Sequence, residues 1–168
     1  MNILSFICQR CAKCCKNLVF RDSGVLRGLT LFPDEIKYFS DAYVEPYLGV
    51  GKRPHDKGFS VIAYQLITTN CPHLEGNQCK IYEKRPISCR QFPFSLDPDL
   101  DAGVLLGVDM NCPAAVELVN SSDGRVILPD RESAEALLEL KKVGIKNPRK
   151  VWIYDLDSKR WVRYDKLF

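Results

Sequence analysis

Four cysteines lie within eight residues near the start of the chain, in the segment CQRCAKCC. Cys8, Cys11 and Cys14 follow one another at intervals of three residues, and Cys15 is adjacent to the third. The later cysteines are spread over the middle of the chain: Cys71, Cys79, Cys89 and Cys112. This clustering is the strongest constraint on the fold, because such crowded thiols serve metal binding, redox chemistry or disulfide formation.

Apart from its cysteines, the chain has the composition of an ordinary globular protein. Its 168 residues fit one domain, and a chain of this size buries about 70% of the surface that its unfolded form exposes. The net charge is +3, and so mild a charge does not by itself indicate a nucleic-acid partner. We therefore expect no nucleic-acid partner, and the chemical nature of a protein or small-molecule partner stays unknown.

No segment has the pattern of an export signal or a membrane span. The apolar start of the chain is interrupted at Cys8, before the roughly 7–15 apolar residues that a secretory signal contains. No run approaches the roughly 20 apolar residues of a spanning helix. We expect a cytoplasmic protein without membrane contact, in which thiols stay reduced and favour metal ligation over disulfides.

The pattern of apolar and turn-forming residues predicts an α+β fold, small and partly irregular. We expect strands over 18–20, 28–31 and 104–108, a buried strand or hairpin over 59–69, and a terminal hairpin over 151–164 with its turn near Asp157. We expect helices over 33–40 and 131–143, the second ended by Gly144, and single turns over 81–85 and from Pro86. Loops or turns are expected at four places: 49–58, 75–77, 96–101 and Cys112-Pro113.

The cysteines also suggest how the chain is organised. All of them precede residue 118, and the character of the sequence then changes to a helix followed by a hairpin. We therefore assign residues 1–118 to a metal-binding domain. Residues 119–168 form an extension that packs on the same domain.

The first three cysteines have the spacing of an iron–sulfur protein. Bacterial ferredoxins use C-x2-C-x2-C, with a more distant Cys-Pro pair supplying another ligand. This chain has two such pairs, Cys71-Pro72 and Cys112-Pro113. The spacing favours an iron–sulfur cluster as the cofactor.

Zinc is the alternative cofactor. A structural zinc site usually takes two closely spaced ligands from each of two turns. Cys11 and Cys14 fit one such pair, but Cys71 and Cys79 are more widely separated than the usual second pair. Because thiolates bind both metals well, the ligands alone do not decide between them.

Other uses of the same residues stay open. Eight thiols suffice for two four-ligand sites, and the adjacent Cys14 and Cys15 serve two sites more easily than one. Alternatively, Cys15 packs inward as a small apolar residue. A set of disulfides and a C-x-x-C redox pair are further alternatives. His73 is a candidate ligand beside Cys71, and His55 is a weaker one.

Two arginines near Cys89 are candidates for cofactor binding. Arg85 and Arg90 lie on either side of it. A cluster held by four thiolates is negatively charged, so nearby cations stabilise it and raise its potential. Arg90 could equally hold an anionic group of a substrate or form a structural ion pair. No catalytic residue is assigned.

Together these motifs resemble a known family. CQRCAKCC, CPHL, CKIYEKRPISCRQFPF and a final cysteine, over about residues 6–113, are similar to the YkgJ-like cysteine-cluster family, described as zinc- or iron-chelating domains. One departure is Ala12, where the family often has glycine shortly before the double cysteine. The resemblance implies a metal-binding set of eight residues: Cys8, Cys11, Cys14, Cys15, Cys71, Cys79, Cys89 and Cys112.

Three functions follow as hypotheses. The first is an iron–sulfur protein in electron transfer or oxidoreduction. The second is a structural zinc module that serves interaction. The third comes from a branch of the family that resembles flagellin lysine methylases, and it is a cluster-dependent, S-adenosylmethionine-using methyltransferase. This chain is much shorter than those methylases and has no glycine-rich S-adenosylmethionine fingerprint.

Overall fold

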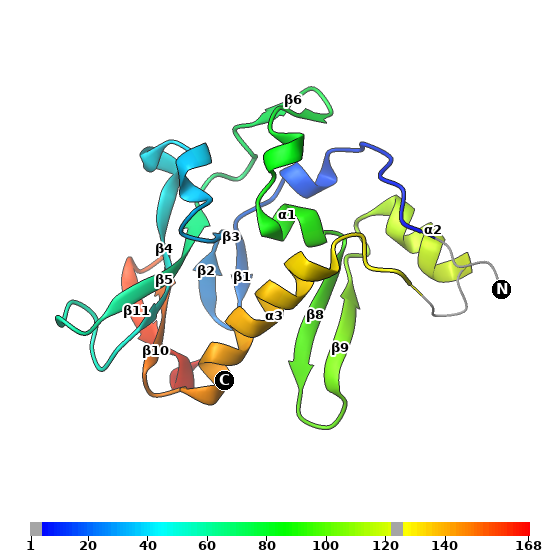
Figure 1. The fold of residues 1–168 in the computed structure, drawn as a ribbon. Coiled ribbons are helices and arrows are strands. Elements are labelled where there is room, and N and C mark those ends of the chain that lie inside the picture. The colour runs from blue at the N-terminus through cyan, green and yellow to red at the C-terminus, as the bar shows by residue number, and fades with distance from the viewer. Residues whose placement is uncertain (1–4, 122–125) are drawn as a thin grey trace. The chain divides into compact units, whose positions relative to one another are not determined.

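The computed structural model describes residues 5–121 and 126–168, which form two compact units. Unit 1 combines Met1–Lys16 with His73–Glu139, and unit 2 combines Asn17–Pro72 with Leu140–Phe168. Each unit is therefore assembled from segments that are distant in the sequence. The α+β class is confirmed, as is the C-terminal helix followed by a hairpin (Figure 1). The division into 1–118 and 119–168 stays a prediction.

Unit 2 is built on an antiparallel sheet of five strands in the order β11-β10-β4-β5-β3. Its strands are β3 (Leu29–Leu31), β4 (Val44–Val50), β5 (Ser60–Leu66), β10 (Val151–Asp155) and β11 (Arg160–Arg163). A separate hairpin pairs β1 (Phe20–Asp22) with β2 (Val25–Arg27). Three short 3-10 turns complete the unit: η2 (Ile36–Tyr38), η3 (Asp41–Tyr43) and η5 (Tyr164–Lys166).

Alternating burial along β10 shows which face of this sheet carries the core. Val151 and Ile153 are buried, whereas Trp152 and Tyr154 between them are only half-buried. Successive side chains of a strand point to opposite faces, so β10 has one core face and one partly exposed face. The core face packs with buried residues of β2, β4 and β5 and with the last turns of α3 (Arg131–Lys146): Val25, Tyr47, Leu48, Ala63, Leu140 and Val143.

Gln65 ties several strands of unit 2 together from within. Its fully buried amide accepts a hydrogen bond from the N–H of Gly28 (2.7 Å). It also donates to the carbonyls of Pro46 (2.8 Å) and Tyr154 (3.1 Å). A buried polar side chain with such partners specifies one arrangement of strands, because losing any partner leaves an uncompensated polar group.

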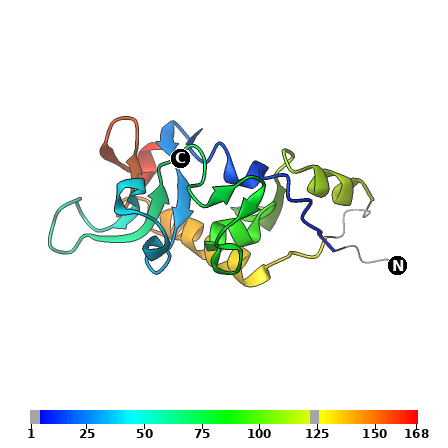
Figure 2. The ribbon, with the colours of Figure 1, turned by 90° about the horizontal axis from the view of Figure 1, so that it is seen from above.

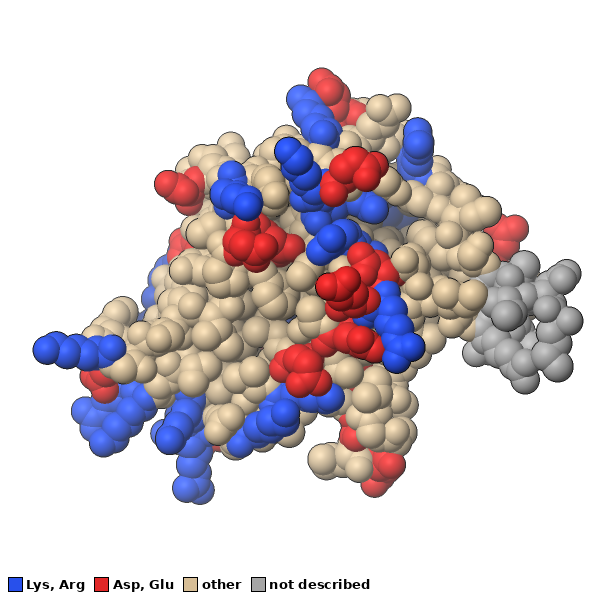
Figure 3. All heavy atoms as spheres, in the orientation of Figure 1, with Lys and Arg blue, Asp and Glu red and all other residues tan. Residues whose placement is uncertain are grey.

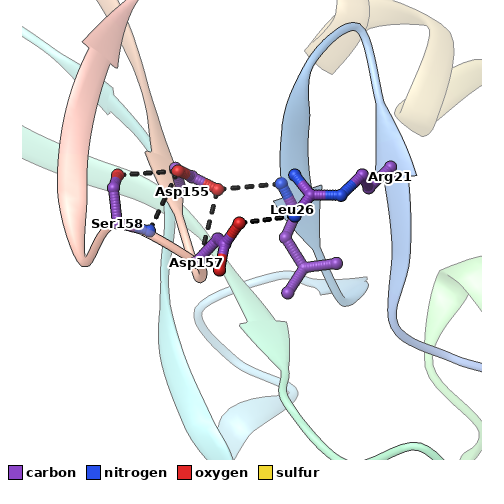
Figure 4. A network of polar contacts seen from close by, with 5 residues as sticks. All are labelled: Arg21, Leu26, Asp155, Asp157 and Ser158. Atoms are coloured by element: carbon purple, nitrogen blue, oxygen red, sulfur yellow. Dashed lines mark hydrogen bonds and ion pairs between the residues drawn. The ribbon is translucent and has the colours of Figure 1, made fainter.

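The carboxylate of Asp155 connects the terminal hairpin to the β1–β2 hairpin (Figure 4). It accepts hydrogen bonds from the N–H groups of Leu26 (2.8 Å), Asp157 (3.2 Å) and Ser158 (3.1 Å). The Ser158 hydroxyl donates to it as well (2.6 Å). Burial by itself raises the pKa of Asp155, but these donors outweigh burial and leave the pKa below its ordinary value.

Unit 1 consists of two hairpins and several helical elements. It contains two hairpins, β6 (Leu74–Glu75) with β7 (Gln78–Cys79) and β8 (Phe94–Asp99) with β9 (Gly103–Val108). Its helical elements are η1 (Lys13–Cys15), η4 (Tyr82–Lys84), α1 (Ile87–Gln91), α2 (Pro113–Ser121) and the start of α3. Buried Cys112, Ala114 and Ala115 pack against three partly buried apolar residues: Phe6, Phe92 and Val108.

Most elements expected from the sequence are present. The strands over 28–31 and 104–108, the turn over 75–77, the two helical turns around Pro86 and the terminal hairpin are confirmed. The segment 59–69 is the single strand β5 rather than a hairpin. The loop predicted over 49–58 begins two residues later, because Gly49 and Val50 belong to β4.

Three expectations were wrong. The helix over 33–40 is only the 3-10 turn η2, since Phe39 takes an extended backbone and buries its side chain. The loop over 96–101 is mostly strand β8, whose Pro98 is tolerated because a two-stranded sheet consists only of edges. Cys112-Pro113 is the start of α2 rather than a turn, with Pro113 at the first helical position.

Gly144 does not end α3, which continues to Lys146. A Cβ at this position would lie 2.2 Å from the ring of Tyr164. The glycine therefore lets the C-terminal segment pack closely against the helix. In the described part of the chain, no helix is both long and apolar enough to span a membrane.

We predict that Asp155→Asn lowers the free energy of unfolding by about 1–3 kcal/mol at pH 7, because an amide cannot accept all four of these hydrogen bonds. A carboxylate with a lowered folded-state pKa stabilises the fold above its unfolded pKa, and this contribution is lost as the pH falls through the folded value. The difference between wild type and variant should therefore shrink below about pH 4. Urea unfolding at pH 7 and pH 3 measures it.

Asp157→Asn is the matched control. Asp157 forms an ion pair with Arg21, and both side chains are more than half exposed. Exposed pairs of this kind contribute about 0–1 kcal/mol. Equal destabilisation by the two variants would contradict the role assigned to Asp155.

Candidate metal centre

Seven of the eight cysteines belong to unit 1, and none of the eight, all of which lie in the described part of the chain, forms a disulfide. Cys71 is the exception, because it lies in unit 2 beside that unit's boundary at Pro72. Six of the seven thiols of unit 1 are half-buried or exposed, and Cys112 is buried. Reduced thiols of mixed exposure are what a metal-binding set requires before it loads.

The first cysteine block folds through unusual backbone conformations. Arg10 and Ala12 both take the left-handed conformation, with φ of 53° and 59°. Ala12 then begins the 3-10 turn η1, in which the N–H of Cys15 donates to the carbonyl of Ala12 (3.1 Å). Glycine adopts this conformation without the Cβ penalty. A glycine at position 12, which the family often has shortly before the double cysteine, would therefore adopt this conformation more easily than alanine does.

A backbone amide already points at one of these sulfurs. The N–H of Arg10 donates to Sγ of Cys8 over 3.4 Å. Such N–H···S contacts stabilise the negative charge of a thiolate and, in iron–sulfur sites, raise the reduction potential. The local fold at Cys8 thus suits a metal-bound sulfur.

Cys112 lies directly before α2, beside the N–H groups of Ala114 and Ala115, the second of which donates to the Cys112 carbonyl over 3.1 Å. Burial raises the pKa of the Cys112 thiol, the two N–H donors oppose that rise, and the nearby thiols of Cys11 and Cys8 add to it. A helix N-terminus favours a negatively charged sulfur once the proton is displaced. The structure therefore brings the last cysteine of the family motif into electrostatic range of the first two.

Cys79 and Cys89 lie on separate short elements of unit 1. Cys79 ends β7, opposite Leu74 in the tight β6–β7 hairpin. Cys89 lies in α1, and its N–H donates to the carbonyl of Pro86 (2.8 Å). The helix begins there because proline is favoured at a helix start, and this places Cys89 within one turn of Pro86. Both side chains are half-buried.

Arg85 and Arg90 are both held by contacts within unit 1. The Arg85 guanidinium lies over the ring of Tyr82 at 3.7 Å, and its Nε donates to the carbonyl of the same residue (2.8 Å). Nε of Arg90 lies 3.7 Å from a carboxylate oxygen of Asp130. Of the roles considered for Arg90, the structure shows the ion pair, with Asp130 as the partner. Cofactor binding by either arginine stays a prediction.

Asp130 is a residue that the sequence pattern did not single out. It caps α3, because its carboxylate accepts the N–H of Ser133 over 2.9 Å. Burial raises its pKa, but the bonds from Ser133 and the charges of Arg90 and Arg85 leave the pKa below its ordinary value. An aspartate immediately before a helical segment is a sequence signal for a cap, so its capping role could have been predicted.

Gln91, two residues after Cys89, was also missed. Its side-chain oxygen is buried and has no hydrogen-bond partner among the described residues. Buried amides nearly always have partners. α1 thus carries one buried polar atom without a partner, and no sequence signal indicates it.

The thiols do not form a complete coordination shell in this structure. Among the residues that it describes, no three Cys, His, Asp or Glu side chains converge closely enough to hold one ion. His73 does not belong to such a group either. Its backbone carbonyl accepts the N–H of Lys80 in the β6–β7 region (2.9 Å). The donor chemistry fits a thiophilic metal, and Cys8 and Cys11 lie close enough to Cys112 to influence its thiol electrostatically.

The motif as a whole matches a family model, described as "CxxCxxCC: Putative zinc- or iron-chelating domain", over residues 7–113. The chain belongs to the CxxCxxCC family. The matched region contains every cysteine of the chain and takes in residues of both compact units. No curated protein and no solved structure matches the chain. The CxxCxxCC family is described as chelating zinc or iron, and it leaves open which of them this member binds.

We predict that Asp130→Ala lowers the free energy of unfolding by about 1 kcal/mol, because the helix cap is lost. Asp130→Asn should retain most of the stability, because asparagine also caps helices and the lost ion pair is partly exposed. Thermal unfolding of the two variants measures the difference. If both lose the same stability, the ion pair with Arg90 is the more important contact.

Proposed function

We propose that this chain binds an iron–sulfur cluster through cysteine thiolates and uses it in electron transfer or another redox reaction. The observation that carries the proposal is the combination of C-x2-C-x2-C spacing with the Cys112 thiol near Cys8 and Cys11. Ferredoxins combine the same spacing with a distant Cys-Pro. When bound, the cluster supplies one-electron redox chemistry.

The surroundings of the thiols support a negatively charged metal centre. The N–H of Arg10 donates to Cys8, and the N–H groups of Ala114 and Ala115 oppose the rise that burial causes in the pKa of Cys112. Hydrogen bonds to the sulfurs disperse the negative charge of a thiolate-bound cluster. Arg85 and Arg90 add positive charge near Cys89, although Asp130 offsets part of the charge of Arg90.

Zinc is the second candidate, because the family description includes it. A zinc site would make the chain a structural interaction module, in which the metal holds distant segments together without redox chemistry. For the methyltransferase alternative, no observation among the described residues favours S-adenosylmethionine, so no function is proposed from it.

Binding of either metal should be strongly coupled to folding. The eight candidate ligands span about 105 positions of the sequence, so a metal bound by them would join distant segments of the chain. In such sites the free energy of metal binding becomes free energy of folding.

We predict that protein purified without oxygen is brown, contains iron and acid-labile sulfide, and loses its visible absorption on reduction with dithionite. Metal analysis and visible spectroscopy test this. If the protein is colourless, redox-silent and contains stoichiometric zinc, the zinc module is supported and the iron–sulfur cluster is contradicted. If it contains neither metal, both proposals are contradicted.

Variants extend the same experiment. Cys112→Ser should lose most of the bound iron and lower the melting temperature of the loaded protein, because it removes the ligand that closes the longest loop of the motif. Ala12→Gly is the matched control within the motif. It keeps every thiol and relieves the left-handed conformation, so it should retain iron and at least wild-type stability. Full iron loading of Cys112→Ser would exclude Cys112 as a ligand.

A further inference from the structure

The net charge of +3 conceals a strong separation of charge between the two units. Unit 2 contains 15 Lys and Arg against nine Asp and Glu, a net charge of +6. Unit 1 contains nine Lys and Arg against 12 Asp and Glu, a net charge of −3. The expectation of no nucleic-acid partner used the whole-chain value, so it does not apply to unit 2 taken alone.

The partly exposed face of the unit 2 sheet carries a group of aromatic rings. Trp161 of β11 lies opposite Tyr154 of β10, with ring centroids 5.3 Å apart. Phe59, at the start of β5, packs against Trp161 at 5.0 Å. Trp152 lies on the same face as Tyr154, two residues away along β10. All four are half-buried, so part of each residue stays accessible.

The loop that joins β4 to β5, residues 51–59, is fixed to this aromatic face at both ends. At its start, the indole N–H of Trp152 donates to the carbonyl of Gly51 over 3.1 Å. At its end, Phe59 packs so closely over Gly49 that a Cβ there would lie 2.2 Å from the ring. Figures 1 and 2 both show this loop projecting beyond the sheet.

The same loop carries a cluster of cations. Lys52, Arg53 and Lys57 are exposed on it, and exposed Lys150 lies at its base, because the carbonyl of Lys150 accepts the N–H of Gly51 (2.8 Å). None of these four side chains forms an ion pair with a described residue. Figure 3 shows Lys and Arg side chains gathered at the left of the view, around the projecting loop.

We propose that this surface, called here the aromatic–basic face, binds single-stranded nucleic acid. It consists of Phe59, Trp152, Tyr154, Trp161, Lys52, Arg53, Lys57 and Lys150. Proteins that bind single strands combine cations that contact the phosphates with aromatic rings on which the bases stack. Here the loop 51–59 carries three of the cations, and its two ends contact the aromatic side of the sheet through Trp152 and Phe59.

The observations favour a nucleic-acid strand over other anionic partners. A membrane surface or an acidic protein would use the cations but has no planar bases to stack on the rings. Duplex DNA keeps its bases stacked on one another, so it presents only phosphates to such a face. A single strand uses both features, which is why it is the occupant proposed.

Intrinsic fluorescence gives a direct readout, because the chain has two tryptophans and both lie on this face. Adding an unlabelled 12-nucleotide oligonucleotide of mixed sequence, as DNA or as RNA, should quench the fluorescence. Anisotropy of the labelled strand at 50–300 mM salt gives the affinity. Stronger binding of one of the two strands would identify RNA or DNA as the preferred ligand.

Three variants separate the contributions. Lys52→Ala, Arg53→Ala and Lys57→Ala combined should weaken binding at least 10-fold and reduce the slope of log affinity against log salt by about 2, since each phosphate contact on a single strand contributes about 0.7. Trp161→Leu should weaken binding roughly 5- to 150-fold, the usual effect of losing one stacked base. The charge-matched control, Lys37→Ala with Lys80→Ala and Lys84→Ala, should bind as wild type.

Three outcomes would overturn the proposal. One is the absence of quenching and of an anisotropy change at 50 mM salt. Another is equal weakening by the loop variant and by the control, which would indicate nonspecific attraction. The third is an equal affinity for heparin that does not depend on Trp161, which would show that the face binds any polyanion. Because the loop residues are exposed, the loop variant stays informative even if Trp161→Leu fails to fold.

Discussion

The position of Cys112 at the beginning of α2 is the constraint on which the candidate metal centre depends. Its side chain lies beside the first N–H groups of the helix, packs in the core of unit 1 and lies near Cys8 and Cys11. One side chain thus contributes to the core and stands both at the helix start and among the candidate metal ligands. A metal that joined distant segments of unit 1 would add its binding free energy to folding, as in other small metal-binding domains.

Unit 2 is stabilised by different means. Its sheet has a conventional apolar face, and two buried polar side chains, Gln65 and Asp155, satisfy backbone groups from several segments. Such a unit needs no metal to specify its strand order. The opposite face of the sheet is then free to carry the aromatic rings and the basic loop. The chain therefore combines a thiol-rich unit with a second unit that has its own surface chemistry.

Local sequence signals account for the elements that were predicted correctly. Alternating apolar residues predict β10 and β11, and a 3.6-residue period predicts α3. The errors occurred where a distant contact decided the local conformation. Burial of Phe39 ended the expected helix over 33–40, and pairing with β9 extended the expected loop over 96–101 into β8. Packing against Tyr164 explains why Gly144 lies within a helix instead of ending it.

The sequence by itself determined the type of chemistry, because eight cysteines at these spacings identify a zinc- or iron-chelating family from residue identity alone. It also determined the α+β class through periodicity. Only the tertiary structure decided that Cys8 and Cys11 lie near Cys112, that Arg90 contacts Asp130, and that Trp152 is bonded to the start of the basic loop. These depend on contacts between residues far apart in the chain, which no local pattern encodes.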